Sequence, residues 1–336
     1  MVMAVLLLFS AAIWGSDNLD NYKNGKFQNL KDHESKSLFD YLVARVKDPF
    51  KDWPNHVPLP QAPVVPDENS KDLKVHYINH SSFLVQHNDF NILTDPVFSK
   101  RVSPVSWAGP KRVMDAGIEK SKLPKIDIIL ISHNHYDHLD LKFLEWISKR
   151  DKPLILVGKK VGQIFSKKVN CIELGWNESK TINDIKFTFT PAQHFSGRTP
   201  FDKNETLWGA FVIESLNLKI YFAGDTGYSD HFKKVHATYG AMDLSLIPIG
   251  AYAPRSFMAY HHMDPEEALK AHRDLNSKYS LGMHWGTFQL TSEPREEPKI
   301  LLEKLKLQNN IQNFYVPTNG DVYSFKNKKL IKKPNS

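Results

Sequence analysis

Short apolar runs separated by turn residues dominate the chain from about residue 73 onward. Residues 74–79, 82–86 and 90–93 are rich in β-branched and aromatic side chains, and this pattern predicts a strand for each. The turn at 87–89 joins the last two as a predicted hairpin. Further strands are predicted at 125–131, 153–157, 172–174, 185–190, 207–213, 219–223, 244–249 and 279–283.

Helical spacing of apolar residues occurs in fewer places. The stretch 140–149 has it, with Asp140 in the N-cap position, and a second helix is predicted at 159–167. Residues 264–269 are typical of a helix start, with an aspartate cap, a proline at the first position and acids in the first turn. Strands come first and then alternate with helices. This order favours two β-sheets packed face to face, with helices outside and a site along one edge.

The N-terminal part of the chain has a different composition. Residues 1–14 form a continuous apolar run, which is short for a membrane-spanning helix but matches a signal-peptide core in length. The first basic residue is Lys23, after this run, so a cleaved export signal and an uncleaved membrane anchor both stay open. Residues 15–72 are polar and then proline-rich, which predicts an extended surface arm. One folded domain at 73–328 and a basic tail at 329–336 complete the expected organisation.

The composition is that of an ordinary soluble globular protein. The 336 residues include 41% hydrophobic and 24% charged residues, and a chain of this length can form one large domain. The net charge of +7 suits an anionic membrane surface or a phosphate-bearing substrate, although a solvated lysine-rich face gives the same value. We find no helix-turn-helix, RNP or zinc-finger spacing, so no nucleic-acid partner is expected. Cys171 is the only cysteine, which excludes an intramolecular disulfide.

The stretch 132–140, with the sequence Ser-His-Asn-His-Tyr-Asp-His-Leu-Asp, follows a predicted strand and precedes a predicted helix. It holds four residues of ligand type within six positions, namely His133, His135, Asp137 and His138. Imidazole and carboxylate both suit zinc, and a rigid strand end fixes where they point. A solvated histidine-rich loop accounts poorly for this density. His133 and His135 can face one metal, while Asp137 and His138 turn toward a second one beside it.

The His-x-His-x-Asp-His pattern after an apolar strand resembles the metallo-β-lactamase superfamily. Six further motifs are similar to those of N-acylphosphatidylethanolamine-hydrolysing phospholipases D and their bacterial relatives, and they occur in order at 93–99, 191–194, 224–228, 248–252, 262–268 and 284–288. The resemblance extends from about residue 75 to residue 325. It implies an α/β fold, the αββα sandwich of two packed β-sheets flanked by helices.

The resemblance also implies two zinc ions and a set of seven ligands. His133, His135 and His194 would hold the first zinc, Asp137, His138 and His284 the second, and Asp225 would bridge them. Each zinc then has four protein ligands, and two neighbouring metals can bind a hydroxide between them and clamp both oxygens of a displacement. True metallo-β-lactamases often have a cysteine at the position of Asp225, which counts against antibiotic hydrolysis.

Further roles follow from the same resemblance. The predicted catalytic residues are Asp137, Asp95 and His262. Asp95 would accept a hydrogen bond from a ligand histidine while also capping a turn, and His262 would contact the substrate phosphate or donate a proton near it. The predicted substrate-binding residues are Tyr136, His261, Arg198 and Arg255. His261 stands where the mammalian enzymes have glutamine, and surface arginines are commonly only solvated.

The predicted function is a dinuclear zinc hydrolase of phospholipase D type, which releases N-acylethanolamine and phosphatidic acid from N-acylphosphatidylethanolamine by attack of a hydroxide held at the metals. A hydrolase of a small soluble lactone or cyclic phosphodiester stays open as an alternative. A non-catalytic zinc-stabilised envelope protein is a second alternative, which the full ligand set argues against. A phospholipid substrate implies association with a membrane surface. Export to the cell envelope, a place at the cytoplasmic face and a homodimer all stay open.

Overall fold

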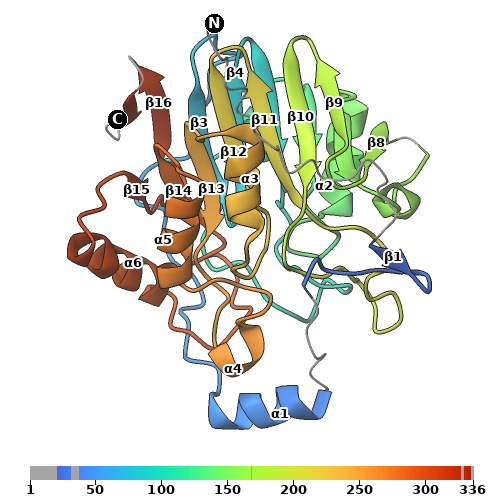
Figure 1. Ribbon diagram of the computed structural model, residues 1–336, viewed down its shortest axis with the longest axis vertical. Coiled ribbons are helices and arrows are strands. Elements are labelled where there is room, and N and C mark those ends of the chain that lie inside the picture. The colour runs from blue at the N-terminus through green and yellow to red at the C-terminus, as the bar shows by residue number, and fades with distance from the viewer. Residues whose placement is uncertain (1–20, 32–37, 168, 327–328, 334–336) are drawn as a thin grey trace, which may run out of the picture.

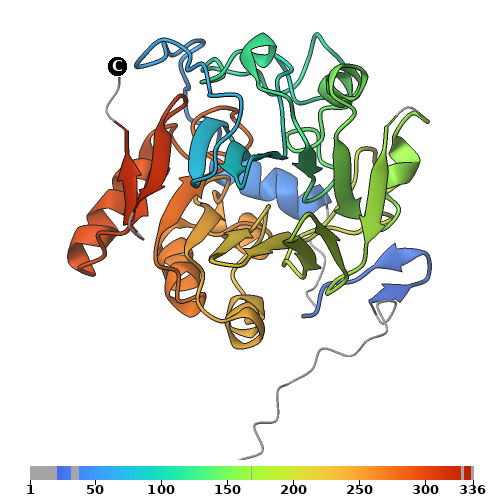
Figure 2. The same cartoon turned by 90° about the horizontal axis from the view of Figure 1, so that it is seen from above.

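The computed structural model describes residues 21–31, 38–167, 169–326 and 329–333. The predicted apolar segment 1–14 lies outside the described residues, as does the end of the predicted basic tail. Two large β-sheets pack face to face, and helices lie on their outer faces (Figures 1 and 2). The predicted sandwich architecture is therefore confirmed.

In the described part of the chain, one sheet has eight strands in the order β17-β16-β3-β4-β5-β6-β7-β8. Their bounds are β3 Lys74–Asn79, β4 Ser82–His87, β5 Phe90–Thr94, β6 Ile128–Leu130, β7 Leu154–Gly158, β8 Cys171–Leu174, β16 Val322–Lys326 and β17 Lys329–Lys332. The strands β5 to β8 run parallel, while β3, β4 and β16 pair antiparallel with their neighbours.

The facing sheet has seven described strands in the order β15-β14-β13-β12-β11-β10-β9. Their bounds are β9 Ser179–Ile182, β10 Ile185–Thr190, β11 Ala210–Ser215, β12 Leu218–Phe222, β13 Leu244–Pro248, β14 Ser280–Met283 and β15 Phe314–Tyr315. The strands β12 to β15 run parallel. A separate two-stranded ribbon is formed by β1 Tyr22–Lys23 and β2 Lys26–Phe27.

The two-residue period of a strand explains where the core lies. In β4, Phe83 and Val85 point into the main core between the sheets, while Leu84 points outward into a second cluster. The same division separates Ile128 and Leu130 of β6 from Ile129 beside them. Strands covered on both faces lack a polar side, which is why their sequences are almost continuously apolar.

The helices cover the outer faces of both sheets. α2 (Leu141–Arg150) packs Phe143, Leu144 and Ile147 on the outside of the eight-stranded sheet. α3 (His231–Tyr239), α5 (Pro265–Asp274) and α6 (Glu297–Gln308) lie on the side of the seven-stranded sheet (Figure 1). α4 (Arg255–Met258) contacts α1 (Leu38–Lys47). Short 3-10 turns occur at η1 Lys120–Lys122 and η2 Val161–Ile164. Within the described residues, every helix is too short or too polar to cross a bilayer.

Two local predictions are wrong. The predicted extended arm contains the ten-residue helix α1, whose sequence Leu-Phe-Asp-Tyr-Leu-Val-Ala-Arg-Val-Lys has apolar residues at helical spacing. The predicted helix at 159–167 is only the four-residue turn η2, because Lys160 before it has a left-handed backbone with φ of 66° and Phe165 after it is extended. In addition, β9, α3, α4, α6 and β15 to β17 were not predicted.

The parallel strands give the fold its functional edge. Parallel neighbours end at the same side of a sheet, so the segments that follow β5, β6, β12 and β14 all emerge together. These segments carry Asp95, the stretch 132–140, Asp225 and His284. The hairpin strand β10 ends at the same edge and is followed by His194. Residues distant in sequence therefore meet at one place.

Candidate metal centre

The segment between β6 and α2 forms a tight turn that brings three histidines and an aspartate together. Asp140 caps α2 by accepting a hydrogen bond from the Phe143 amide at 3.2 Å, as predicted. Its other oxygen accepts the amides of Phe98 and Ser99 at 3.0 and 2.8 Å. One carboxylate therefore fixes both the start of the helix and the loop that follows β5, which leaves the preceding histidines rigidly placed.

His133, His135 and His194 form the first group of donors. Their ligand atoms lie together, with 2.8 Å between His133 Nε2 and His135 Nδ1 and 3.3 Å between His194 Nε2 and His135 Nδ1. His133 and His194 are fully buried, and His135 is partly exposed. The structure thus brings together the three residues predicted to hold the first metal.

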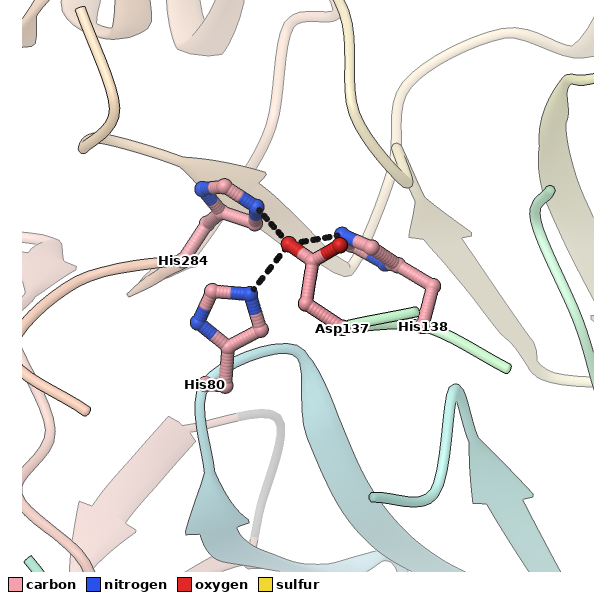
Figure 3. A group of neighbouring side chains, drawn as sticks. All are labelled: His80, Asp137, His138 and His284. Carbon is pink, nitrogen blue, oxygen red and sulfur yellow. Dashed lines mark hydrogen bonds and ion pairs between the residues drawn. The ribbon is translucent and has the colours of Figure 1, made fainter. Parts of the chain in front are cut away.

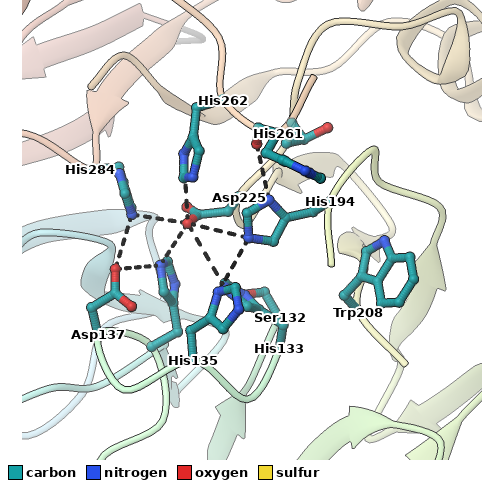
Figure 4. Close-up of polar contacts among 12 residues, drawn as sticks. Ser132, His133, His135, Asp137, His194, Trp208, Asp225, His261, His262 and His284 are labelled. Atoms are coloured by element: carbon teal, nitrogen blue, oxygen red, sulfur yellow. Dashed lines mark hydrogen bonds and ion pairs between the residues drawn. The ribbon is translucent and has the colours of Figure 1, made fainter. Parts of the chain in front are cut away.

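Asp225 lies at the centre of the site (Figure 4). Its Oδ2 atom is 3.1 Å from His138 Nε2 and 3.0 Å from His284 Nε2. The same oxygen is 3.8 Å from His194 Nε2 and 3.9 Å from His133 Nε2. One oxygen atom therefore faces both groups of donors, which is the placement that a bridging ligand requires.

A glycine allows the Asp225 turn to approach the histidine turn. Gly224 has a left-handed φ of 58°, and a Cβ atom there would lie 2.5 Å from the Ser132 Cβ. Any other residue at this position would push the two turns apart. The glycine thus determines how closely Asp225 approaches the first histidines.

Asp137, His138 and His284 form the second group, together with His80, which sequence reasoning did not single out (Figure 3). The Oδ2 atom of Asp137 lies 3.3 Å from His138 Nε2, 3.2 Å from His284 Nε2 and 3.0 Å from His80 Nε2. His80 is buried on the turn between β3 and β4. A lone histidine on a strand turn carries no spacing signal, so sequence reasoning had no basis for placing His80 here.

The charges of the site are distributed unevenly. Burial opposes ionisation of Asp225 and Asp137, but the neighbouring histidines hold the pKa of both carboxyls well below the usual value. Burial likewise opposes the charged form of His284, but Asp225 and Asp137 raise its pKa to about 9. Burial lowers the pKa of His135 to about 4. Both carboxylates are therefore anionic at neutral pH and available to a cation.

Asp95 supports two of the histidines from behind. Its Oδ2 accepts a hydrogen bond from His138 Nδ1 at 2.6 Å, and the Ser132 hydroxyl also donates to it. That hydroxyl in turn contacts His133 Nδ1 at 2.8 Å. The Oδ1 atom of Asp95 accepts a hydrogen bond from the Ser132 backbone amide at 2.8 Å. Asp95 thus lies where a residue that orients ligand rings is expected, and it also fixes a turn.

His262 lies across Asp225 from the histidine turn (Figure 4). It is buried, and its Nδ1 is 3.9 Å from Asp225 Oδ2. His261 contacts the site mainly through its backbone, because its carbonyl accepts a hydrogen bond from His194 Nδ1 at 3.0 Å. Its ring packs on Phe195 with 4.6 Å between centroids. The substrate role of His261 stays a prediction, and its carbonyl supports the ring of His194.

Tyr136 and Arg198 border a cavity of about 520 Å³ beside the histidine turn. The Arg198 guanidinium lies 3.8 Å from the centroid of the Tyr136 ring and donates to the carbonyls of Asn134 and Leu139. The other side chains that line the cavity include Lys100, Arg101 and Lys142. Four cations thus face a space that opens next to the candidate metal centre.

Arg255 is engaged elsewhere. Its guanidinium contacts Glu267 at 2.7 Å and Asp264 at 3.3 Å, and it donates to the His262 carbonyl at 2.8 Å. A bound anion would have to compete with two carboxylates for it. This placement favours a role in holding the loop before α5 rather than the predicted binding of substrate.

The N-terminal arm also contacts the site. The side chain of Asn29 pairs with the backbone of His194 on both sides, since Nδ2 donates to the carbonyl at 2.7 Å and Oδ1 accepts the amide at 3.1 Å. Trp208 Nε1 donates to the same Oδ1 at 3.2 Å. Phe27, two residues earlier, is buried in the main core. The predicted surface arm is therefore packed against the candidate metal centre at this point.

Comparison with known proteins agrees with this geometry. Residues 90–285 match the model of a beta-lactamase superfamily domain. An uncharacterised protein of Mycobacterium bovis is 35% identical over 298 residues, covering 84% of this chain and 78% of its own length. A Caenorhabditis elegans protein named N-acyl-phosphatidylethanolamine-hydrolyzing phospholipase D 1 is 37% identical over 245 residues, covering 68% of each chain.

A solved structure confirms the fold independently of close sequence similarity. The metallo hydrolase Igni18 of Ignicoccus hospitalis superposes with a TM-score of 0.58 at 22% identity, over 76% of this chain and 98% of its own. At this identity the likeness concerns the fold alone.

Proposed function

This chain belongs to the metallo-β-lactamase superfamily of metal-dependent hydrolases, and we propose that it cleaves the phosphodiester bond of N-acylphosphatidylethanolamine. The products are N-acylethanolamine and phosphatidic acid. The observation that carries the proposal is one oxygen of Asp225 that faces two groups of donors, beside a cavity lined by cations. The name of the Caenorhabditis elegans relative supports this choice of substrate.

Two zinc ions fit the donors that meet here. His133, His135 and His194 would hold the first ion, and Asp137, His138 and His284 the second, with Asp225 between them. Five imidazoles and two carboxylates are donors that zinc accepts well, and both carboxylates are anionic at neutral pH. A structural zinc site is usually closed around one ion, so two joined groups beside a cavity favour catalysis.

When bound, the ions would supply an activated water and positive charge for the phosphate. In the proposed reaction the water oxygen bonds to phosphorus, the bond from phosphorus to the ethanolamine oxygen breaks, and that oxygen takes a proton. His262 faces Asp225 from the side opposite the histidine turn, and in this proposal it donates a hydrogen bond to a phosphate oxygen. Asp95 orients the ring of His138 by a direct hydrogen bond and the ring of His133 through the hydroxyl of Ser132.

The cavity beside Tyr136 suits a phosphate-bearing lipid. Lys100, Arg101, Lys142 and Arg198 line it, and the one acid among its lining residues, Asp140, already accepts three amides. The cations would attract the anionic headgroup region toward the metals. Tyr136 would then stand at the junction of the cavity and the metal centre.

The loop that forms one wall of this cavity supports action at a membrane surface. Trp107, at 79% exposed, follows the lining residues 103–106, and the exposed Val105 lies among them. An exposed tryptophan beside lysine and arginine is typical of a segment that rests at the headgroup level of a bilayer. We therefore place the phospholipid and its membrane on this side of the protein.

The test is hydrolysis by the purified full chain after metal analysis. N-acylphosphatidylethanolamine in mixed micelles is compared with a water-soluble phosphodiester, a lactone and a cyclic phosphodiester. Asp225→Asn serves as the inactive control, and Asp230→Asn, an exposed carboxylate on the same loop, serves as its matched control.

We expect turnover of the micellar lipid to exceed that of each soluble substrate. Preference for a soluble lactone or cyclic phosphodiester would overturn the lipid assignment while leaving the metal site intact. Absence of hydrolysis in protein that carries its metals would instead point to the non-catalytic alternative.

A further inference from the structure

His80 occupies a backbone position that favours glycine. It lies on the turn between β3 and β4 with a left-handed φ of 46°, and its side chain is only 1% exposed. A residue with a Cβ atom is strained in this conformation by about 1 kcal/mol, whereas glycine is not. This chain therefore accepts a local strain in order to place an imidazole there.

The ring and the carbonyl of His80 both contact the second group of donors, although Tyr77, Thr287 and Phe288 also touch this residue. Its Nε2 lies 3.0 Å from Asp137 Oδ2, and its carbonyl accepts the His284 amide at 2.9 Å. Its ring packs on that of His284 with 4.1 Å between centroids. The Nδ1 atom has no hydrogen bond within the described part of the chain, so Asp137 is the polar partner of the ring.

The distances separate His80 from the predicted ligands. The Nε2 atoms of His138 and His284 each approach two carboxylates, Asp137 at 3.3 and 3.2 Å and Asp225 at 3.1 and 3.0 Å. His80 approaches Asp137 alone. A cation that uses both carboxylates belongs on the side where they face each other. His80 therefore reaches the second group through Asp137, from a different side than His138 and His284 (Figure 3), and in the described part of the chain it forms no ion pair with Asp225.

We propose that His80 is a positioning residue for the second metal. Its Nε2–H donates to the Asp137 carboxylate, while its carbonyl and ring hold His284, so that one turn of the chain orients two of the ligands. The proposal rests on the two-metal assignment above and is independent of the lipid substrate. Hydrogen-bonded supports of this kind are worth about 10–100-fold in metal affinity.

Three variants separate this role from a general effect on folding. His80→Gly removes the imidazole and is compatible with the left-handed backbone. His80→Gln keeps an N–H donor at a similar reach. Asn88→Gly is the matched control, because Asn88 is an exposed left-handed residue, with φ of 51°, on the next turn of the same sheet.

The readouts are metal content, resistance of each bound ion to a chelator, and the visible spectrum of the cobalt-substituted protein. We expect His80→Gly to retain the first ion, to lose the second one about 10–100-fold more readily than the parent chain, and to show an altered spectrum. His80→Gln should recover most of the loss, and Asn88→Gly should match the parent.

Two outcomes would overturn the proposal. One is a His80→Gly protein that keeps both ions with parental chelator resistance and spectrum. The other is an equal loosening of both ions together with a lower melting temperature of the metal-free protein, which would make His80 purely structural. A parent chain that binds a single ion would refute the two-metal assignment itself, and the control variants reveal that result separately.

Discussion

Replacing Asp225 by asparagine is the sharpest test of the shared carboxylate. The substitution keeps the size and shape of the side chain and removes one negative charge at a buried position. The affected oxygen lies 3.0 Å from His284 Nε2, 3.1 Å from His138 Nε2 and less than 4 Å from the nitrogens of His133 and His194. This single oxygen therefore lies within 4 Å of nitrogens from both groups of donors.

The expected magnitude follows from these distances. The Asp225 carboxylate and a positive charge about 3 Å away attract each other by on the order of 5 kcal/mol at an effective dielectric constant of about 20. Because each 1.4 kcal/mol is about tenfold, losing this attraction in the catalytic complex lowers turnover by roughly 10³–10⁴-fold. The fold should persist, since an amide of equal volume leaves neither a cavity nor an overpacked core.

The assay measures metal content, thermal unfolding and lipid hydrolysis on one preparation. Asp230→Asn on the same loop should resemble the parent chain in all three. Near-normal turnover by Asp225→Asn with two bound metals would show that Asp225 is not the bridge.

Three further predictions concern other parts of the molecule. His262→Ala should leave metal content unchanged and lower turnover about 100-fold, the usual scale for a lost hydrogen-bond donor at developing charge; a destabilised protein with normal turnover at low temperature would contradict this role. Trp107→Ser should reduce sedimentation with anionic lipid vesicles while leaving hydrolysis of a soluble phosphodiester unchanged, and equal vesicle binding by both proteins would exclude this loop as the docking segment. Burial lowers the pKa of His76 from 6.5 to about 4. On acidification the unfolded chain therefore takes up a proton at this residue before the folded chain does. The contribution of His76 to the free energy of unfolding is complete above pH 6.5 and is lost as the pH falls toward 4. The loss from this residue is up to about 3 kcal/mol; urea unfolding of the parent and His76→Phe proteins across this range measures it, and equal acid sensitivity of both would refute the assignment.

The elements that could be predicted from sequence are those whose formation depends on residues close together in the chain. The strand runs at 82–86 and 90–93 and the capped helix at Asp140 depend on neighbouring residues, and all three are present. The helix α6 had apolar residues at 300–302 and 305 that should have predicted it. The left-handed Lys160 and the extended Phe165, which confine the segment 159–167 to one short turn, depend on packing that no local pattern shows.

The residues of the site also fall into those that a local sequence pattern reveals and those that only the tertiary fold brings together. The histidine turn is one short stretch, so its density of ligand-type residues was visible at once, and the family resemblance supplied His194, Asp225 and His284. Their meeting depends on the common edge of two sheets, a tertiary fact. His80 could not be found from sequence because one histidine on a strand turn has no periodicity or spacing to distinguish it from any other buried histidine.

Asn29 gives the N-terminal arm a mechanical meaning. The side-chain amide of this residue forms hydrogen bonds with both the carbonyl and the amide of His194, and Phe27 is buried in the core two residues earlier. Tension applied to the amino end of the chain would be resisted along residues 22–29, where Tyr22, Phe27 and Asn29 each contact the folded domain. If the apolar residues 1–14 hold the protein at a membrane, the load on that tether passes through Asn29 to a residue proposed to bind metal. Membrane attachment and the candidate metal centre would then be mechanically connected through the same short segment.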